Sequence, residues 1–155
     1  LIDVIKNFDP TKIELNIITN NFDLRYKEII NKFKNKKNLN FLVNFKLDKI
    51  IKKMLQTHVF MFPSYSEGLA RSPIEALACG NYAILSKIFM KDYDIENLAI
   101  SFLDQKQPKI WMKKLYKIRN ELNIPNKIFR RNNQLVLKYF SHENFIKSYI
   151  EHLNI

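Results

Sequence analysis

Short apolar segments rich in β-forming residues alternate with amphipathic segments of helical period along most of the chain. The pattern predicts strands at Ile13–Thr19, Leu39–Val43, His58–Phe62, Tyr82–Leu85 and Leu98–Leu103. It predicts helices at Leu1–Phe8, Leu24–Phe33, Leu47–Leu55, Pro73–Cys79, Pro108–Leu122 and Pro125–Phe140. Strands separated by helices pair in parallel through right-handed crossovers, so we expect an α/β protein with a Rossmann-like, doubly wound parallel sheet. Ligands of such sheets bind at the carboxyl ends of the strands.

The length of 155 residues suits one compact domain. Hydrophobic residues make up 46% of the chain, which excludes a disordered protein. No apolar run approaches the roughly 18 residues that a membrane-spanning helix needs, so we expect a soluble domain. The first predicted helix opens at Leu1 with no initiating methionine ahead of it. We therefore expect the chain to be part of a longer protein.

The chain carries a formal net charge of +11, which raises the question of an anionic partner. Only five of its 26 basic residues are arginines, and the lysines are spread among asparagines and isoleucines. We expect no specific nucleic-acid binding, and peripheral contact with an acidic membrane surface fits this distribution better. The lone Cys79 has no cysteine to pair with and no metal-ligand spacing around it, which indicates the reducing cytoplasm.

The two glycines of the chain, Gly68 and Gly80, flank the same predicted helix. Gly68 follows a strand, where a residue without a Cβ permits a sharp turn and close approach to a ligand. Ser72 is predicted as the N-cap, Pro73 as the first helical residue, and Gly80 as the left-handed residue that ends the helix. The N-terminus of this helix would then face the strand ends and suit a phosphate group.

The carboxylate of Glu75 has two interpretations on local sequence alone. With Ser72 it forms a capping box, in which Glu75 accepts the backbone N–H of Ser72 and has a structural role only. Alternatively it faces the ligand site at the helix N-terminus. Glu67 taken alone would be an exposed loop carboxylate.

The segment from Phe62 to Ser86 reads FPSYSEGLARSPIEALACGNYAILS. It closely resembles the signature of retaining GT-B glycosyltransferases of family 4, the glycosyl transferases group 1. That signature is an apolar strand, Pro-Ser, Glu-Gly, a second glutamate, and an alanine-rich helix that ends in glycine before another strand. Glu67 and Glu75 occupy the two glutamate positions. The match covers about a sixth of the chain, and the β/α order resembles the C-terminal domain of that fold throughout.

The resemblance implies that this domain binds a nucleotide-diphosphate sugar and transfers the glycosyl group, with retention of configuration, to an acceptor that the sequence does not identify. Glu75 would accept hydrogen bonds from the ribose hydroxyls, and Glu67 would contact the donor sugar as the catalytic residue. The backbone of Gly68, Leu69 and Ala70 would run beside the sugar and the diphosphate. The resemblance implies no metal and no cofactor other than the donor substrate.

The resemblance also implies a division of the chain. Residues 1–140 would form the donor-binding domain, incomplete at its N-terminus, and residues 141–155 a helix that crosses back to an absent N-terminal acceptor domain. The phosphate-neutralising cations would precede residue 1, so we expect this fragment to be inactive alone. The implied setting is polysaccharide biosynthesis in the cytoplasm, peripheral to the inner face of the membrane.

The family signature is incomplete around the turn that would contact the base of the nucleotide. Such proteins commonly have a glycine there, where this chain has Val43, so Asn44 and Phe45 are weak candidates for contact with the base. Similarly, Asn20 and Asn21 replace glycines that usually follow the strand before them. These differences indicate a divergent member.

Other patterns indicate different chemistry. Asp92 and Asp94 form an Asp-x-Asp, a metal and diphosphate motif of the other major glycosyltransferase fold, but no good apolar strand precedes it. Glu67 and Glu75 could in principle form a glycosidase acid/base pair. A non-catalytic basic Rossmann-like module that binds nucleotide, nucleic acid or membrane is the alternative to an enzyme. The histidines are scattered and fit no ligand spacing; they are His58, His142 and His152.

Overall fold

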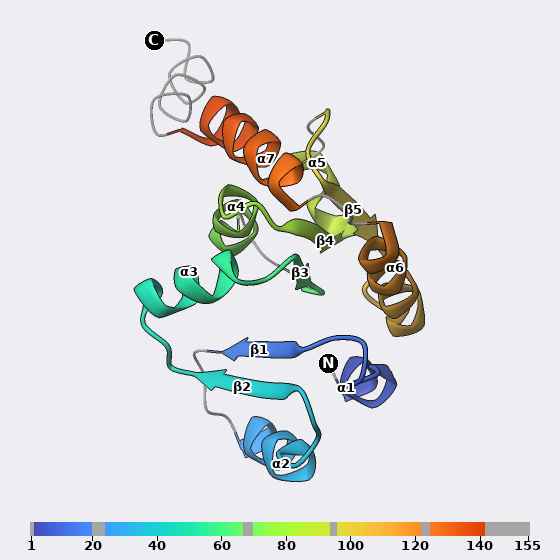
Figure 1. Ribbon diagram of the computed structural model, residues 1–155. Helices are drawn as coiled ribbons and strands as arrows, with labels where there is room; N and C mark the ends of the chain where they lie inside the picture. Colours follow the sequence, from blue (N-terminus) through green and yellow to red (C-terminus); the bar gives the residue numbers. More distant parts are fainter. Residues whose placement is uncertain (1, 20–23, 67–69, 94–95, 122–124, 142–155) are drawn as a thin grey trace.

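The computed structural model describes residues 2–19, 24–66, 70–93, 96–121 and 125–141 of an α/β protein (Figure 1). The strands are β1 (Leu15–Thr19), β2 (Leu39–Val43), β3 (Val59–Phe62), β4 (Tyr82–Ser86) and β5 (Ile100–Leu103). The helices are α1 (Ile2–Asn7), α2 (Leu24–Phe33), α3 (Leu47–Leu55), α4 (Arg71–Ala78), α5 (Met90–Tyr93), α6 (Pro108–Glu121) and α7 (Pro125–Phe140). The predicted α/β class is confirmed, and α2, β2, α3 and α7 have the bounds that the sequence predicts.

The strands pair in parallel throughout the described residues, but they form two sheets. One sheet has the order β1-β2 and the other has the order β3-β4-β5. The register places Leu15 beside Leu39 in the first sheet and Val59 beside Tyr82 in the second. Parallel pairing follows from the helical crossovers that the sequence predicts. The division into two sheets was not predicted.

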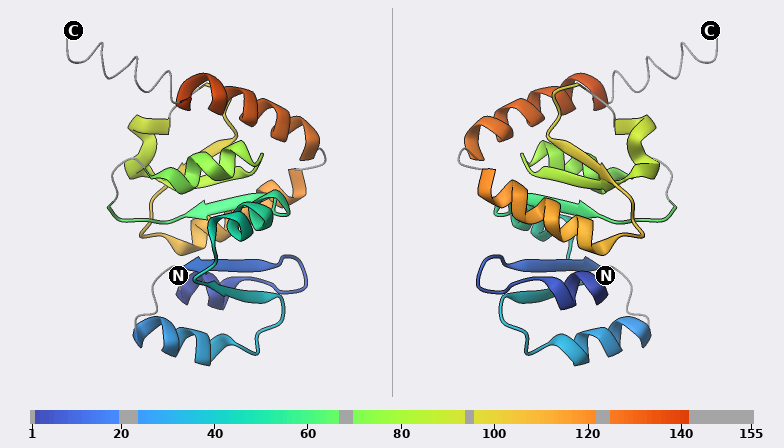
Figure 2. Two further views of the ribbon diagram at one scale, coloured as in Figure 1. Left: turned by 90° about the vertical axis from the view of Figure 1, so that its left-hand side faces the viewer. Right: turned by 90° about the vertical axis from the view of Figure 1, so that its right-hand side faces the viewer.

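Helices cover both faces of the strands (Figure 2). α1 and α6 lie on one face, whereas α3 and α4 lie on the other. Such two-sided cover is what buries the near-continuous apolar runs of parallel strands. Among the helices that the structure describes, none is both long and apolar enough to cross a bilayer.

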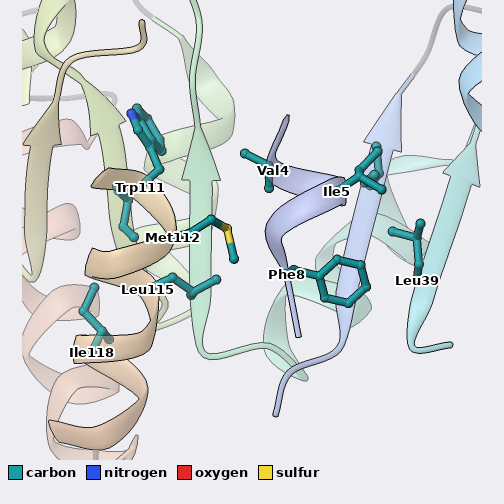
Figure 3. Packing of buried hydrophobic residues seen from close by; sticks show 10 residues of the cluster. Val4, Ile5, Phe8, Leu39, Trp111, Met112, Leu115 and Ile118 are labelled. Atoms are coloured by element: carbon teal, nitrogen blue, oxygen red, sulfur yellow. The ribbon is translucent and has the colours of Figure 1, made fainter. Parts of the chain in front are cut away.

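The larger core lies between the strands and the face formed by α1 and α6 (Figure 3). Trp111 is its largest buried side chain, with 1% of its surface exposed. The indole N–H donates to the carbonyl of Asp104 at 2.8 Å, so the buried ring leaves no unpaired donor. Trp111 is thus a core residue.

A second core lies between α4, the β3-β4-β5 sheet and α7. Two buried asparagines join these elements through backbone groups. The amide of Asn132 on α7 donates to the carbonyl of Asn81 at 2.8 Å, and its carbonyl accepts the N–H of Ala99 at 3.0 Å. The amide of Asn81 in turn donates to the carbonyl of Thr57 at 2.6 Å. Because these groups are buried, the network fixes α7 against the sheet.

The segment after β4 is helical, which the sequence did not predict. A 3₁₀-helix at Lys87–Phe89 leads into α5, and Phe89 fills the core with 1% of its surface exposed. The predicted helix beyond Ser141 falls outside the described residues.

Replacement of Asn132 by alanine tests the buried network. The N–H of Ala99 and the carbonyl of Asn81 would both lose their partner inside the core, so we expect the free energy of unfolding to fall by about 1–3 kcal/mol. Urea denaturation measures this change. Asn120→Ala on the exposed side of α6 is the matched control, with an expected change within about 0.5 kcal/mol. Equal effects of the two substitutions would contradict the network's role.

Candidate functional site

The candidate site lies where β3 ends and the chain turns into α4. Residues 63–66 follow the strand, and the hydroxyl of Ser64 donates to the carbonyl of Ser66 at 3.3 Å. Tyr65 is 66% exposed at this edge. The predicted site residues Glu67, Gly68 and Leu69 lie outside the described residues.

Ala70, the next predicted site residue, is the N-cap of α4. Its backbone is extended, with φ −73° and ψ 123°, and the residue is buried at 9% exposure. Ala70 itself is therefore the extended residue from which the chain enters the helix. This placement agrees with the predicted location of the site at the strand ends.

The prediction that Ser72 caps the helix is wrong, because α4 begins at Arg71. Pro73 is the third helical residue rather than the first. The first four N–H groups of a helix have no partner within it, so proline is tolerated throughout the first turn and does not mark its first residue.

The earlier start of α4 changes the role of Glu75. A capping box needs its glutamate at the third helical position, and Glu75 is the fifth residue of α4. Glu75 is half-buried, and its carboxylate has no hydrogen-bond or ion-pair partner among the residues that the structure describes. The capping interpretation is therefore wrong. A carboxylate with two acceptor oxygens thus lies on the first turns of α4.

Gly80 closes α4 as predicted, in the left-handed conformation with φ 86°. The N–H of Gly80 donates to the carbonyl of Leu77 at 2.9 Å, and the N–H of Asn81 donates to the carbonyl of Ala76 at 3.0 Å. These two bonds are the Schellman motif, which favours glycine because a Cβ would clash. The turn returns the chain directly into β4, and this holds α4 close to β3 and β4.

Two further residues lie at the strand ends: Ser86, which was not predicted as part of the site, and Asn44, which was predicted only as a weak candidate for contact with the base. Ser86 ends β4, is fully buried, and donates its hydroxyl to the carbonyl of Phe62 at 3.3 Å, which ties the carboxyl ends of β3 and β4 together. Asn44 follows β2 with φ 55° and donates its N–H to the carbonyl of Thr19 at 3.0 Å. Asparagine is one of the few residues other than glycine that tolerate this left-handed conformation.

The structure adds little support for the Asp-x-Asp motif or for a ligand role of the histidines. In the described ranges, no group of three or more His, Cys, Asp or Glu residues is placed to hold a metal ion. Asp92 lies in α5, after a 3₁₀-helix rather than after a strand, and Asp94 is outside the described residues. His58 is an exposed residue ahead of β3.

Comparison with known families decides the class of the protein. The family model of glycosyl transferases group 1 matches residues 1–128, which is most of the chain and includes β1 to β5 and the candidate site. The chain belongs to the glycosyl transferases group 1 family. No curated protein matches it closely enough to count as a relative. Membership supports glycosyl transfer in general.

Cys79 of this glycosyltransferase lies one helical turn after Glu75, and the two side chains interact electrostatically. Burial raises the pKa of the Cys79 thiol, and the negative charge of Glu75 raises it further. Cys79 is thus a half-buried residue with weakened nucleophilicity.

The thiol of Cys79 reports on the charge of Glu75. Glu75→Gln removes the negative charge, so we expect the thiol pKa to fall and alkylation by iodoacetamide at pH 8 to become faster. The pH dependence of the alkylation rate gives the pKa directly. Glu121→Gln, an exposed residue at the end of α6, is the control and should leave the rate unchanged. An unchanged rate in Glu75→Gln would show that the carboxylate does not act on Cys79.

Proposed function

We propose that this domain binds a nucleotide-diphosphate sugar at the carboxyl ends of β3 and β4 and serves a retaining glycosyltransferase. The observation that carries the proposal is the half-buried carboxylate of Glu75 on α4, which has no hydrogen-bond or ion-pair partner among the described residues and lies within a segment that the family model covers. Glu75 would accept hydrogen bonds from the two vicinal hydroxyls of the ribose, since a carboxylate offers two acceptor oxygens in one plane.

Glu67 would be the catalytic residue, in contact with the hydroxyls of the donor sugar. Gly68, Leu69 and Ala70 would bring the backbone beside the sugar and the diphosphate. The N-terminus of α4, which follows Ala70, adds a positive dipole end near the leaving diphosphate. Fixed partners for the charges that develop on the diphosphate and the anomeric carbon lower the barrier to transfer.

The cations that neutralise the diphosphate would come from sequence ahead of residue 1, and the acceptor site from a further N-terminal domain. Residues 1–140 would then be the donor-binding domain and 141–155 the return to that N-terminal domain. On this account the 155-residue chain alone binds the donor weakly and shows no turnover.

Peripheral contact with an acidic membrane from the cytoplasmic side is the second part of the proposal. The net charge of +11 and the exposed lysines of α3, Lys49 and Lys52, support it. Lysines near an anionic surface each add about 1 kcal/mol of attraction.

The proposal predicts that both glutamates are needed for turnover. In the enzyme with its N-terminal half restored, we expect Glu75→Ala to lower kcat/KM about 10- to 100-fold, because one charged acceptor of the donor is lost. Glu67→Ala should lower kcat more than it raises KM. A panel of nucleotide-diphosphate sugars, assayed by release of the nucleoside diphosphate, measures both effects.

Glu121→Ala is the control for these substitutions, since Glu121 is exposed on α6 and lies next to Lys117 at 3.6 Å. The anomeric configuration of the product, read by NMR, tests retention. A non-catalytic binding module would show no turnover to lose, and wild-type turnover in Glu75→Ala would rule out the proposed role of that residue.

Chelation tests the expectation that transfer needs no metal. We expect the initial rate to be the same with and without excess EDTA, because protein cations and helix dipoles, not a metal ion, would neutralise the diphosphate. If EDTA abolished the activity and added Mg²⁺ or Mn²⁺ restored it, this expectation would be contradicted and a metal site would be favoured.

A further inference from the structure

α3 exposes a row of apolar side chains to solvent. Leu47 and Leu55 are 60% and 56% exposed, which is high for such large apolar groups. Ile51 lies between them along the helix and is half-buried. Residues four apart on a helix are neighbours, so Leu47, Ile51 and Leu55 form one row, here called the leucine stripe. α3 is the outermost described helix on its side of the molecule in Figure 1, and it lies on the near face in the left view of Figure 2.

Other residues hold α3 in the fold. Met54 is buried, and its carbonyl accepts a hydrogen bond from the amide of Asn81 at 2.9 Å. The ammonium group of Lys53 lies 3.1 Å from the carboxylate of Glu14, which joins α3 to the residue before β1. Leucines that stay more than half exposed add little to the free energy of folding. The apolar area of the leucine stripe therefore remains available to a partner.

Exposed lysines lie beside the leucine stripe at a spacing of three residues; they are Lys46, Lys49 and Lys52. The same spacing leads from Lys52 to Leu55, so the row of lysines meets the leucine stripe there. Residues 46–55 contain four lysines and one acidic residue, Asp48. This surface of α3 is therefore both apolar and positively charged.

An anionic membrane surface suits both properties. Its phosphate headgroups attract lysines, and the acyl boundary beneath them accepts apolar side chains from a helix that lies in the plane of the membrane. Lysine side chains are long enough to keep their ammonium groups among the headgroups while their methylene stems cover apolar area. A nucleic-acid backbone would attract the same lysines but offers no apolar layer for the leucines.

We infer that the surface of α3 formed by the leucine stripe and Lys46, Lys49 and Lys52 binds an anionic lipid bilayer, with Leu47 and Leu55 entering its acyl boundary. The inference rests on the peripheral membrane contact proposed above and assigns that contact to one surface of the molecule. α3 has nine residues, which suits shallow and reversible binding at the interface rather than deep insertion.

α6 carries similar charge without a leucine stripe. It lies on the opposite face from α3 and exposes three lysines, which are Lys109, Lys113 and Lys117. In α6, which the structure describes throughout, the exposed large apolar residue is Ile110, at 43%. Positive charge with one isolated apolar side chain gives attraction to a membrane without insertion. Substitutions on α6 therefore serve as controls for those on α3.

Flotation of the 155-residue chain with lipid vesicles tests the inference. The vesicles contain equimolar phosphatidylglycerol and phosphatidylcholine, and vesicles of phosphatidylcholine alone show the dependence on charge. We expect Leu47→Ser with Leu55→Ser to lower partition onto the anionic vesicles about tenfold or more, because the acyl boundary loses both side chains. The control pair, Ile110→Ser with Leu137→Ser, removes exposed apolar side chains from α6 and α7 and should change partition less than about twofold.

A second pair of substitutions separates the position of the charge from its amount. Lys49→Gln with Lys52→Gln on α3 and Lys109→Gln with Lys113→Gln on α6 remove equal charge from opposite faces. We expect partition to fall about tenfold or more for the α3 pair and less than about threefold for the α6 pair, since attraction decays within a Debye length of the membrane. Circular dichroism should show every variant as folded as the wild type, because all the replaced side chains are exposed.

Four results would overturn the inference. Unchanged partition in the Leu47→Ser, Leu55→Ser variant would show that the leucines do not enter the bilayer, and would leave the peripheral contact itself in place. Equal losses in the two lysine pairs would assign the attraction to net charge rather than to this surface. A dimer in gel filtration that the leucine substitutions abolish would assign the leucine stripe to a second copy of the chain. Absence of wild-type partition onto anionic vesicles would overturn the membrane contact as well, while donor binding is tested separately by nucleotide titration.

Discussion

Parallel pairing of β3 with β4 fixes the position of every described part of the candidate site. The register that places Phe62 beside Leu85 brings the two strand ends to one level, and the hydroxyl of Ser86 joins them. The chain between these strands must then cross one face of the sheet and return, which it does as α4. The length of that crossover places Ala70 at the strand ends and Glu75 one turn further along the helix. Loss of this pairing would separate the glutamate from the strand ends that define the site.

The turn from α4 back into β4 depends on one glycine and two asparagines, Gly80, Asn81 and Asn132. Gly80 takes the left-handed conformation that ends α4, and Asn81, directly after it, joins the turn to the end of α3 and to α7. A packed network of this kind holds a helix rigidly, and a binding group on a rigid helix keeps its geometry. The family signature around Gly80 therefore includes residues that hold α4 in place as well as residues with a proposed chemical role.

Much of the fold could be predicted because it depends on local pattern. α3 and α7 have strong helical periodicity, and their predicted bounds agree with the structure. The start of α4 could not be predicted well, because proline fits any position of a first turn and so does not identify which one it occupies. The division into two sheets depends on pairing between distant segments, which hydrophobic pattern alone does not specify. The helical segment after β4 depends on burial of Phe89, again a tertiary effect.

The candidate site was predicted from an ordered motif rather than from composition. The structure describes some of its residues and leaves others outside the described ranges. It removed the capping interpretation of Glu75 and added Ser86 to the strand ends. The hydroxyl of Ser86 contacts the backbone of Phe62, and this contact depends on which strands are neighbours, so the sequence could not assign Ser86 to the site. The prediction for Glu67, Gly68 and Leu69 stays a prediction.

Nuclear magnetic resonance mapping of nucleotide binding tests the central claim most directly. Uridine, adenosine and guanosine diphosphates are added in turn, at millimolar concentration, to the isotopically labelled chain. The account predicts that at least one of them shifts the amide signals of Ala70, Ser72, Glu75 and Ser86, at the strand ends and along the first turns of α4. Shifts confined to the lysines of α3 and α6, or no shifts with any nucleotide, would contradict it.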